Sequence, residues 1–121
     1  MSIRLALTLV IASLATACGL GDLLGEQAPV HCDFRKGSSN GPEDRCQELV
    51  PGAPQAGEMH KAACLTAQAT PGDGLCPREG VVGGCDLGKQ LDGTETRDWY
   101  YAPMTREEAR SSCGDDTPLD P

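Results

Sequence analysis

The chain has 121 residues, a formal net charge of −8 and only four aromatic side chains. An acidic balance argues against nucleic acid and anionic lipid as partners, because binding to phosphate groups requires clustered Lys or Arg. The few aromatics, together with 15 glycines and 9 prolines, leave little material for a hydrophobic core. We therefore expect one small domain that depends on covalent cross-links for its stability.

Residues 1–17 have the pattern of a signal peptide. Arg4 is followed by an apolar stretch from Leu5 to Leu14, and the small residues Ala15 and Ala17 follow that stretch. The apolar stretch is shorter than the about 20 residues that a membrane-spanning helix needs. We predict that residues 1–17 are removed, which leaves Cys18 as the first residue and a formal net charge of −9.

Cys18 is the odd member of a set of seven cysteines. Residues 14–18 resemble the bacterial lipobox, with Ala15 where Leu is commonest, and the resemblance implies a diacylglycerol on Cys18. Lipidation would consume the odd thiol and leave an even set of six, and two or three fatty chains anchor a protein stably. Gly19, by analogy with a known sorting rule, favours the outer membrane of the cell envelope. The alternative is a soluble secreted protein with a free or intermolecular Cys18.

The first half of the chain after the cleavage site predicts a tether, two strands and a helix. Residues 18–30 are expected to form a lipidated tether with a reach on the order of 20 Å. Alternating residue types predict short strands at Cys32–Arg35 and Arg45–Val50, separated by a turn. Good helix formers from Glu58 to Leu65 predict a helix of two or three turns that ends before Thr70.

The second half begins with turn-forming residues at 71–80. Val81–Cys85 predicts a buried strand and Arg97–Tyr101 a second one, so the two form a hairpin with a long loop at Asp86–Thr96.

A capping box at Thr105–Glu108 predicts a short helix that reaches Cys113. Residues 114–121 are acidic and are expected to be a disordered tail.

Six cysteines remain in the body of the chain, and no C-x-x-C pair occurs among them. Behind a signal peptide, this set predicts three disulfides, each worth about 2 to 4 kcal/mol. Six cysteines allow fifteen pairings. We predict Cys32 with Cys46, Cys64 with Cys76, and Cys85 with Cys113. The expected domain, residues 31–113, is of the small disulfide-rich α+β class, with two short helices on an irregular antiparallel sheet.

The order of these motifs resembles a group of bacterial proteins. The motifs are Cys32-Asp33-Phe34, Cys46-Gln47-Glu48, Cys64, Cys76-Pro77, Val82-Gly83-Gly84-Cys85, Trp99-Tyr100-Tyr101 and Cys113. Small cysteine-rich lipoproteins and secreted modules of environmental bacteria, particularly myxobacteria, have a similar order. The resemblance implies a shared disulfide scaffold and carries no assigned activity. In that group a Gly-rich segment is expected after the last cysteine, where this chain has its acidic tail.

Two patterns in the sequence are candidate sites. His60 and Cys64, four residues apart, would share one helix face as in half of a zinc site, but Cys64 is the more readily explained by a disulfide. Trp99, Tyr100 and Tyr101 are the best candidates for a binding surface, because an exposed aromatic stacks on a sugar ring or anchors a protein contact. The alternative is that these three side chains fill the core.

No Ser or Cys nucleophile motif, cofactor loop or metal-binding spacing is distinguished in the sequence. We therefore expect no catalytic residue, no cofactor and no metal. The expected function is that of a non-enzymatic binding or structural module, anchored in the bacterial envelope by its lipid, with an envelope protein or glycan as partner. The second hypothesis is a disulfide-knotted inhibitor of a secreted hydrolase, in which the Asp86–Thr96 loop enters the cleft of the target.

Overall fold

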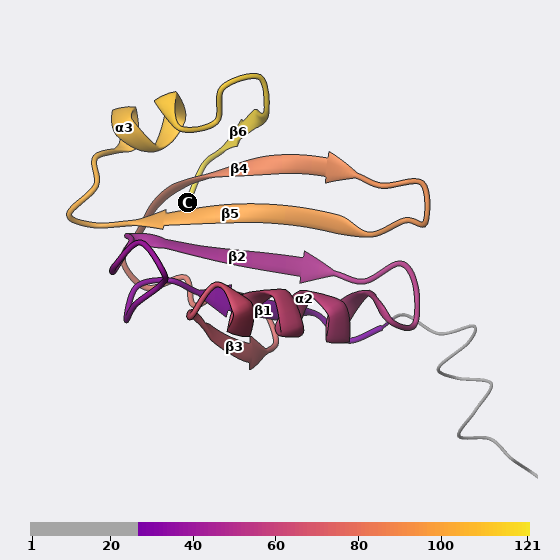
Figure 1. Cartoon of the computed structure of the whole chain (residues 1–121). Helices are drawn as coiled ribbons and strands as arrows, with labels where there is room; N and C mark the ends of the chain where they lie inside the picture. The colour runs from indigo at the N-terminus through magenta and orange to yellow at the C-terminus, as the bar shows by residue number, and fades with distance from the viewer. Residues whose placement is uncertain (1–26) are drawn as a thin grey trace, which may run out of the picture.

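The computed structural model describes residues 27–121 as a six-stranded antiparallel sheet with two helices (Figure 1). The strand order is β3-β1-β2-β5-β4-β6. The signal peptide, Cys18 and most of the expected tether lie outside the described residues. The elements, in chain order, are β1 (Val30–Asp33), β2 (Arg45–Val50), α2 (Ala56–Thr66), β3 (Thr70–Asp73), β4 (Val81–Lys89), β5 (Glu95–Tyr101), α3 (Arg106–Ser111) and β6 (Thr117–Leu119).

The register of the strands assigns residues to the two faces of the sheet. Residues directly opposite each other on neighbouring strands share a face. Cys32 lies opposite Gln47, Gln47 opposite Asp98, and Asp98 opposite Cys85, so these four belong to one face. Cys32 is bonded to Cys64 of α2, and Cys85 is bonded to Cys113 just after α3. Both helices are therefore fixed to this face, which we call the helical face.

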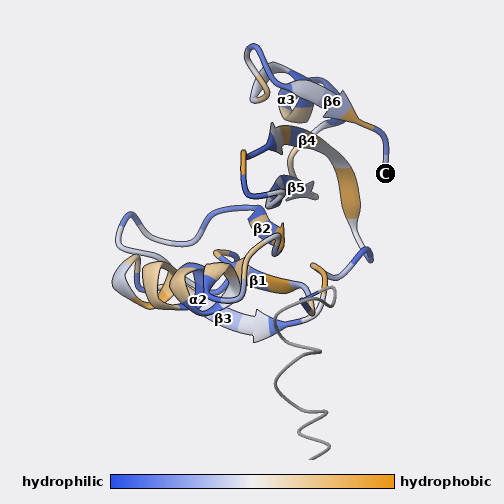
Figure 2. Ribbon diagram, turned by 90° about the vertical axis from the view of Figure 1, so that its right-hand side faces the viewer, coloured by the Kyte–Doolittle hydropathy of each residue, from blue (hydrophilic) through white to orange (hydrophobic). Residues whose placement is uncertain are grey.

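The opposite face is covered by a loop, residues 74–80, which we call the strap. The Cys46–Cys76 disulfide joins the strap to β2. The Arg78 guanidinium lies 4.1 Å from the centroid of the Trp99 ring and donates a hydrogen bond of 2.8 Å to the buried carboxylate of Glu48. Seen along the strands, α2 lies to one side of β1 and β2 (Figure 2). The thin core is thus divided between a helical layer and a strap layer.

The structure confirms the disulfide-rich α+β class. The strand at Arg45–Val50 and both helices are present, and the Thr105 side chain accepts from the Glu108 amide as the capping box predicts. Among residues 27–121, no helix is long and apolar enough to cross a membrane.

Two strands lie where the sequence predicts turns or disorder. β3 contains Pro71, which an edge strand tolerates because its missing N–H is not required there. A Cβ on Gly72 would lie 2.5 Å from the His31 ring, so only glycine permits this approach. In the expected disordered tail, β6 pairs with β4, and Leu119 packs against the cluster that contains Trp99. The prediction of a disordered 114–121 is therefore wrong.

The predicted disulfide pairing is right for Cys85–Cys113 and wrong for the other two bonds. The structure joins Cys32 to Cys64 and Cys46 to Cys76. The physical reason is the register between β1 and β2. Cys46 lies opposite Asp33, one residue beyond Cys32, so the two cysteines point to opposite faces of the sheet. Each one can therefore reach only the layer on its own side.

Candidate functional site

The aromatic run of β5 lies in the interior. Trp99, Tyr100 and Tyr101 are 7%, 8% and 3% exposed. Arg78 covers the Trp99 ring, and Arg35 lies 4.1 Å from the centroid of the Tyr101 ring. These three residues fill the core, as the alternative interpretation had it. The expectation that they form an exposed binding surface is corrected, because both faces of their strand are covered.

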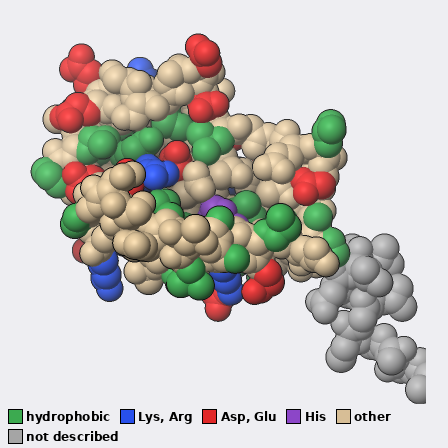
Figure 3. Space-filling view, viewed as in Figure 1, with side chains coloured by type: hydrophobic (Ala, Val, Ile, Leu, Met, Phe, Trp, Pro, Cys, Tyr) green, Lys and Arg blue, Asp and Glu red, His purple; other side chains and the backbone are tan. Residues whose placement is uncertain are grey.

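A surface hollow lies between the first half of α2 and the tip of the β4–β5 hairpin. We call it the hairpin hollow, and its volume is about 440 Å³. On the side that carries α2, hydrophobic side chains are interspersed with acidic ones near this end of the molecule (Figure 3). The lining residues are Leu49, Ala53, Gln55, Ala56, Met59, His60, Gln90, Asp92 and Thr94.

Close contact between two loops builds this hollow. A Cβ on Gly52 would lie 2.3 to 2.4 Å from backbone atoms of Asp92, Gly93 and Thr94. The Gly52 amide also donates to Thr94 Oγ1 at 3.0 Å. Glycine at position 52 therefore allows the loop before α2 to touch the hairpin tip, and the two loops form the wall of the hollow.

The tip of the hairpin, residues 90–94, is held by its own hydrogen bonds. The Gln90 amide donates to the Thr94 carbonyl at 2.8 Å, and the Thr94 amide donates to Asp92 Oδ1 at 2.9 Å. Hydrogen bonding from Thr94, chiefly from its backbone amide, holds the pKa of Asp92 below its usual value. Leu91, at the apex, is fully exposed to solvent. The long loop expected at Asp86–Thr96 is thus a tight turn on a longer hairpin, because β4 continues to Lys89.

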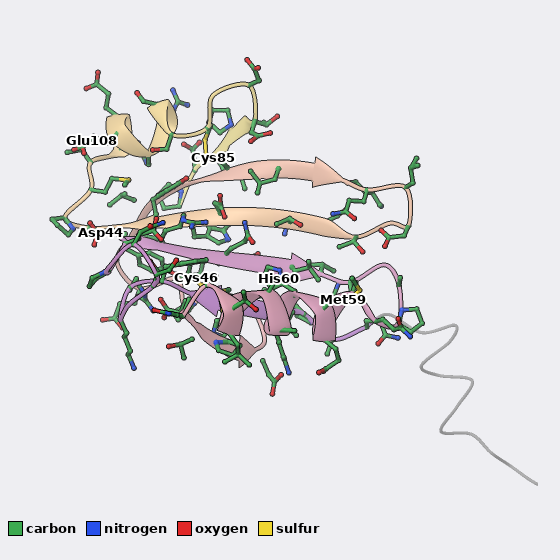
Figure 4. The ribbon with its side chains drawn as sticks, viewed as in Figure 1. Asp44, Cys46, Met59, His60, Cys85 and Glu108 are labelled. Carbon is green, nitrogen blue, oxygen red and sulfur yellow. A yellow bond between two sulfur atoms is a disulfide. The ribbon has the colours of Figure 1, made fainter. Side chains whose placement is uncertain are left out.

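His60 is the unusual polar group of the hollow. Its Nε2 atom is buried and has no hydrogen-bond partner among the described residues. Burial lowers the pKa of His60, and its interactions with Gln47 and Asp98 oppose that effect only in part. Figure 4 shows His60 and Met59 on α2, and both residues line the hollow. A neutral imidazole with a free nitrogen can accept or donate one hydrogen bond, depending on its tautomer.

A polar row continues from the hollow across the helical face. Gln47 Nε2 donates to Asp98 Oδ1 at 2.9 Å, and Arg45 Nη1 lies 3.6 Å from the same oxygen. Burial raises the pKa of Asp98 in spite of these two partners. The row supplies hydrogen-bonding groups next to the apolar lining of the hollow.

The half zinc site considered from the sequence does not form, because Cys64 is bonded to Cys32. Within residues 27–121, no group of three or more His, Cys, Asp or Glu side chains is placed to hold a metal ion. The sequence does not predict the hairpin hollow, because its walls come from segments about 40 positions apart that meet only in the folded chain.

Comparisons with protein-family models, with curated proteins and with solved structures gave no match. A concave surface with an apolar lining and a few convergent polar groups is typical of a binding site.

Proposed function

We propose that the protein is an envelope-anchored lipoprotein whose domain is a non-enzymatic binding module, with the hairpin hollow as its binding surface. The observation that carries this proposal is a concave, mainly apolar surface between α2 and the hairpin tip, with a few polar side chains at its edge. The volume of the hollow falls within the range of about 300 to 1,000 Å³ that is typical of ligand pockets. The fitting ligand is an apolar group of an envelope partner.

The cysteine pattern supports the anchoring part of the proposal. All six cysteines of the described residues are paired with one another. Disulfides persist in oxidising compartments, so three of them agree with export. Cys18 is then the one cysteine without a partner in this set, as a lipid attachment site requires.

Site-specific photo-crosslinking in living cells tests the binding surface. A photoreactive amino acid replaces Met59, which lines the hollow and is 67% exposed. The matched control replaces Leu65, which is 63% exposed near the other end of α2. We expect a discrete crosslinked product from position 59 and none from position 65. Identical products from both positions, or none from position 59, would contradict the proposal.

The rigid hairpin tip supports a second candidate function, inhibition of a secreted hydrolase. An inhibitory loop must be rigid, because ordering a flexible one on binding costs affinity. The hydrogen bonds of the tip meet this requirement, and Leu91 is presented at its apex. The test is a titration of secreted proteases that prefer large aliphatic residues. Stoichiometric inhibition that is lost in Leu91→Ala and kept in Leu65→Ala supports it, and no inhibition by the parent chain rejects it.

A further inference from the structure

We propose that the tip of the β4–β5 hairpin faces the lipid surface, with Leu91 as the side chain that enters it. This inference rests on the anchoring at Cys18 proposed above, and it adds the orientation of the domain relative to the membrane. It follows from the position of the tether, the exposed apolar residues and the low charge of the hairpin tip.

The chain enters the domain beside the hairpin tip. Gln27 and Pro29 line one surface depression together with Lys89, Gly93 and Glu95. The start of β1 and the hairpin tip therefore lie at the same end of the molecule (Figure 1). Cys18 lies nine positions before Gln27, and even a fully extended chain of that length spans at most about 30 Å. An acyl chain on Cys18 would keep this end of the domain close to the lipid.

This end also carries the most exposed apolar side chains of the described residues. Leu91 is fully exposed and Met59 is 67% exposed. Transfer of an exposed apolar side chain from water into the apolar part of a bilayer is favourable. The tip is already ordered by its own hydrogen bonds and by its contact with Gly52, so insertion would require little further ordering.

The hairpin tip itself carries little charge. At the tip, Lys89 lies 3.5 Å from Glu95, which leaves Asp92 as the one acidic side chain of the turn without a cation beside it in the described structure. A turn with a single unpaired carboxylate presents little charge to a lipid surface, so charge repulsion opposes the entry of Leu91 only weakly.

The hairpin hollow stays open in this orientation. Leu49, in its lining, lies on the helical face, because Leu49 is opposite Val30, two residues from Cys32 on β1. The hollow thus opens to the side of the hairpin and not at its apex. An envelope partner would reach it from the side, close to the lipid surface.

Tryptophan quenching by lipid measures this orientation directly. Leu91→Trp and the matched control Leu65→Trp place a new indole at two exposed leucines, and the native Trp99 is a buried background. The protein is extracted from membranes and reconstituted in phosphatidylcholine vesicles that contain lipids brominated on their acyl chains. We expect the added emission of Leu91→Trp to be mostly lost, while that of Leu65→Trp and of the parent chain stays unchanged.

A second preparation separates this inference from the anchoring proposal. Residues 18–121 with a histidine tag at their N-terminus are held on the same vesicles by nickel-chelating lipid, so the attachment point is kept without acylation. If the native protein does not float with vesicles, the anchoring proposal is overturned. If the Leu91→Trp emission of the tagged form is quenched in the same experiment, the lipid-facing tip is still supported. Vesicle-bound protein whose Leu91→Trp emission is not quenched overturns the lipid-facing tip, and it assigns Leu91 to a protein target instead.

Discussion

Removal of the Cys46–Cys76 disulfide, through the double substitution Cys46→Ala and Cys76→Ala, tests how the strap holds the core. The two cysteines of each disulfide are separated by a similar length of chain, namely 32, 30 and 28 positions for the three bonds. For loops of this size the chain-entropy model gives about 3.6 kcal/mol for each bond. Loop closure alone therefore predicts nearly equal losses for the three bonds.

The layer that each bond holds distinguishes them. Cys46 and Cys76 are 0% and 3% exposed and pack in one cluster with Trp99. Release of the strap uncovers part of the Trp99 ring, which adds about 1 to 2 kcal/mol of lost apolar burial. The expected total loss is about 5 kcal/mol, a large share of the about 5 to 15 kcal/mol by which domains are stable.

Urea unfolding, followed by far-ultraviolet circular dichroism and by Trp99 emission, measures both effects. The control is Cys85→Ala with Cys113→Ala, which closes a loop of similar length but lies in a different cluster from Trp99. Before any urea is added, the strap variant should show red-shifted emission and the control should not. Equal emission shifts in the two variants would contradict the role of the strap in covering Trp99. A decrease of less than about 1 kcal/mol in the free energy of unfolding on loss of the strap bond would contradict it as well.

Three further predictions concern stability. Gly84→Ala should destabilise the domain by about 1 to 3 kcal/mol, because a Cβ there would lie 2.6 Å from the Trp99 ring. In contrast, a Cβ at Gly57 in α2 meets only ordinary contacts, so Gly57→Ala should stabilise the domain by about 0.5 to 1 kcal/mol. An equal effect at both positions would contradict the packing. Thr105→Ala should cost about 1 kcal/mol in urea unfolding through loss of the helix cap, and no loss would show that the cap is not used. Burial lowers the pKa of His60, so the unfolded chain binds a proton that the folded chain does not; stability should fall as the pH drops below 6.5, and His60→Gln should reduce that dependence.

Local patterns in the sequence predict much of the fold. The capping box at Thr105 and the alternation at Arg45–Val50 depend on neighbours within a few residues, and the structure has both. The pairing of Cys32 and Cys46 depends on strand register, which one residue of offset reverses. No local signal distinguishes a Cys46 that faces the strap from one that faces α2.

The sequence leaves open whether the aromatic run is buried, and it does not predict the hairpin hollow, for a related reason. Successive side chains of a strand point to opposite faces, so the sequence alone allows Trp99 to be exposed. In the structure Trp99 is buried by Arg78 and Cys76 of the strap, which are more than 20 positions away. The hollow exists because Gly52 touches the backbone of Thr94. Long-range contacts of this kind are formed by the folded chain and leave no periodic pattern in the sequence.

The intact mass of the membrane-extracted protein, measured before and after reduction and alkylation, tests the anchored, disulfide-linked domain most directly. We predict a chain that begins at Cys18, carries the mass of acyl groups, and gains six alkylated thiols only after reduction. An unmodified Cys18, or six thiols that react without reduction, would contradict an anchored domain held by three disulfides.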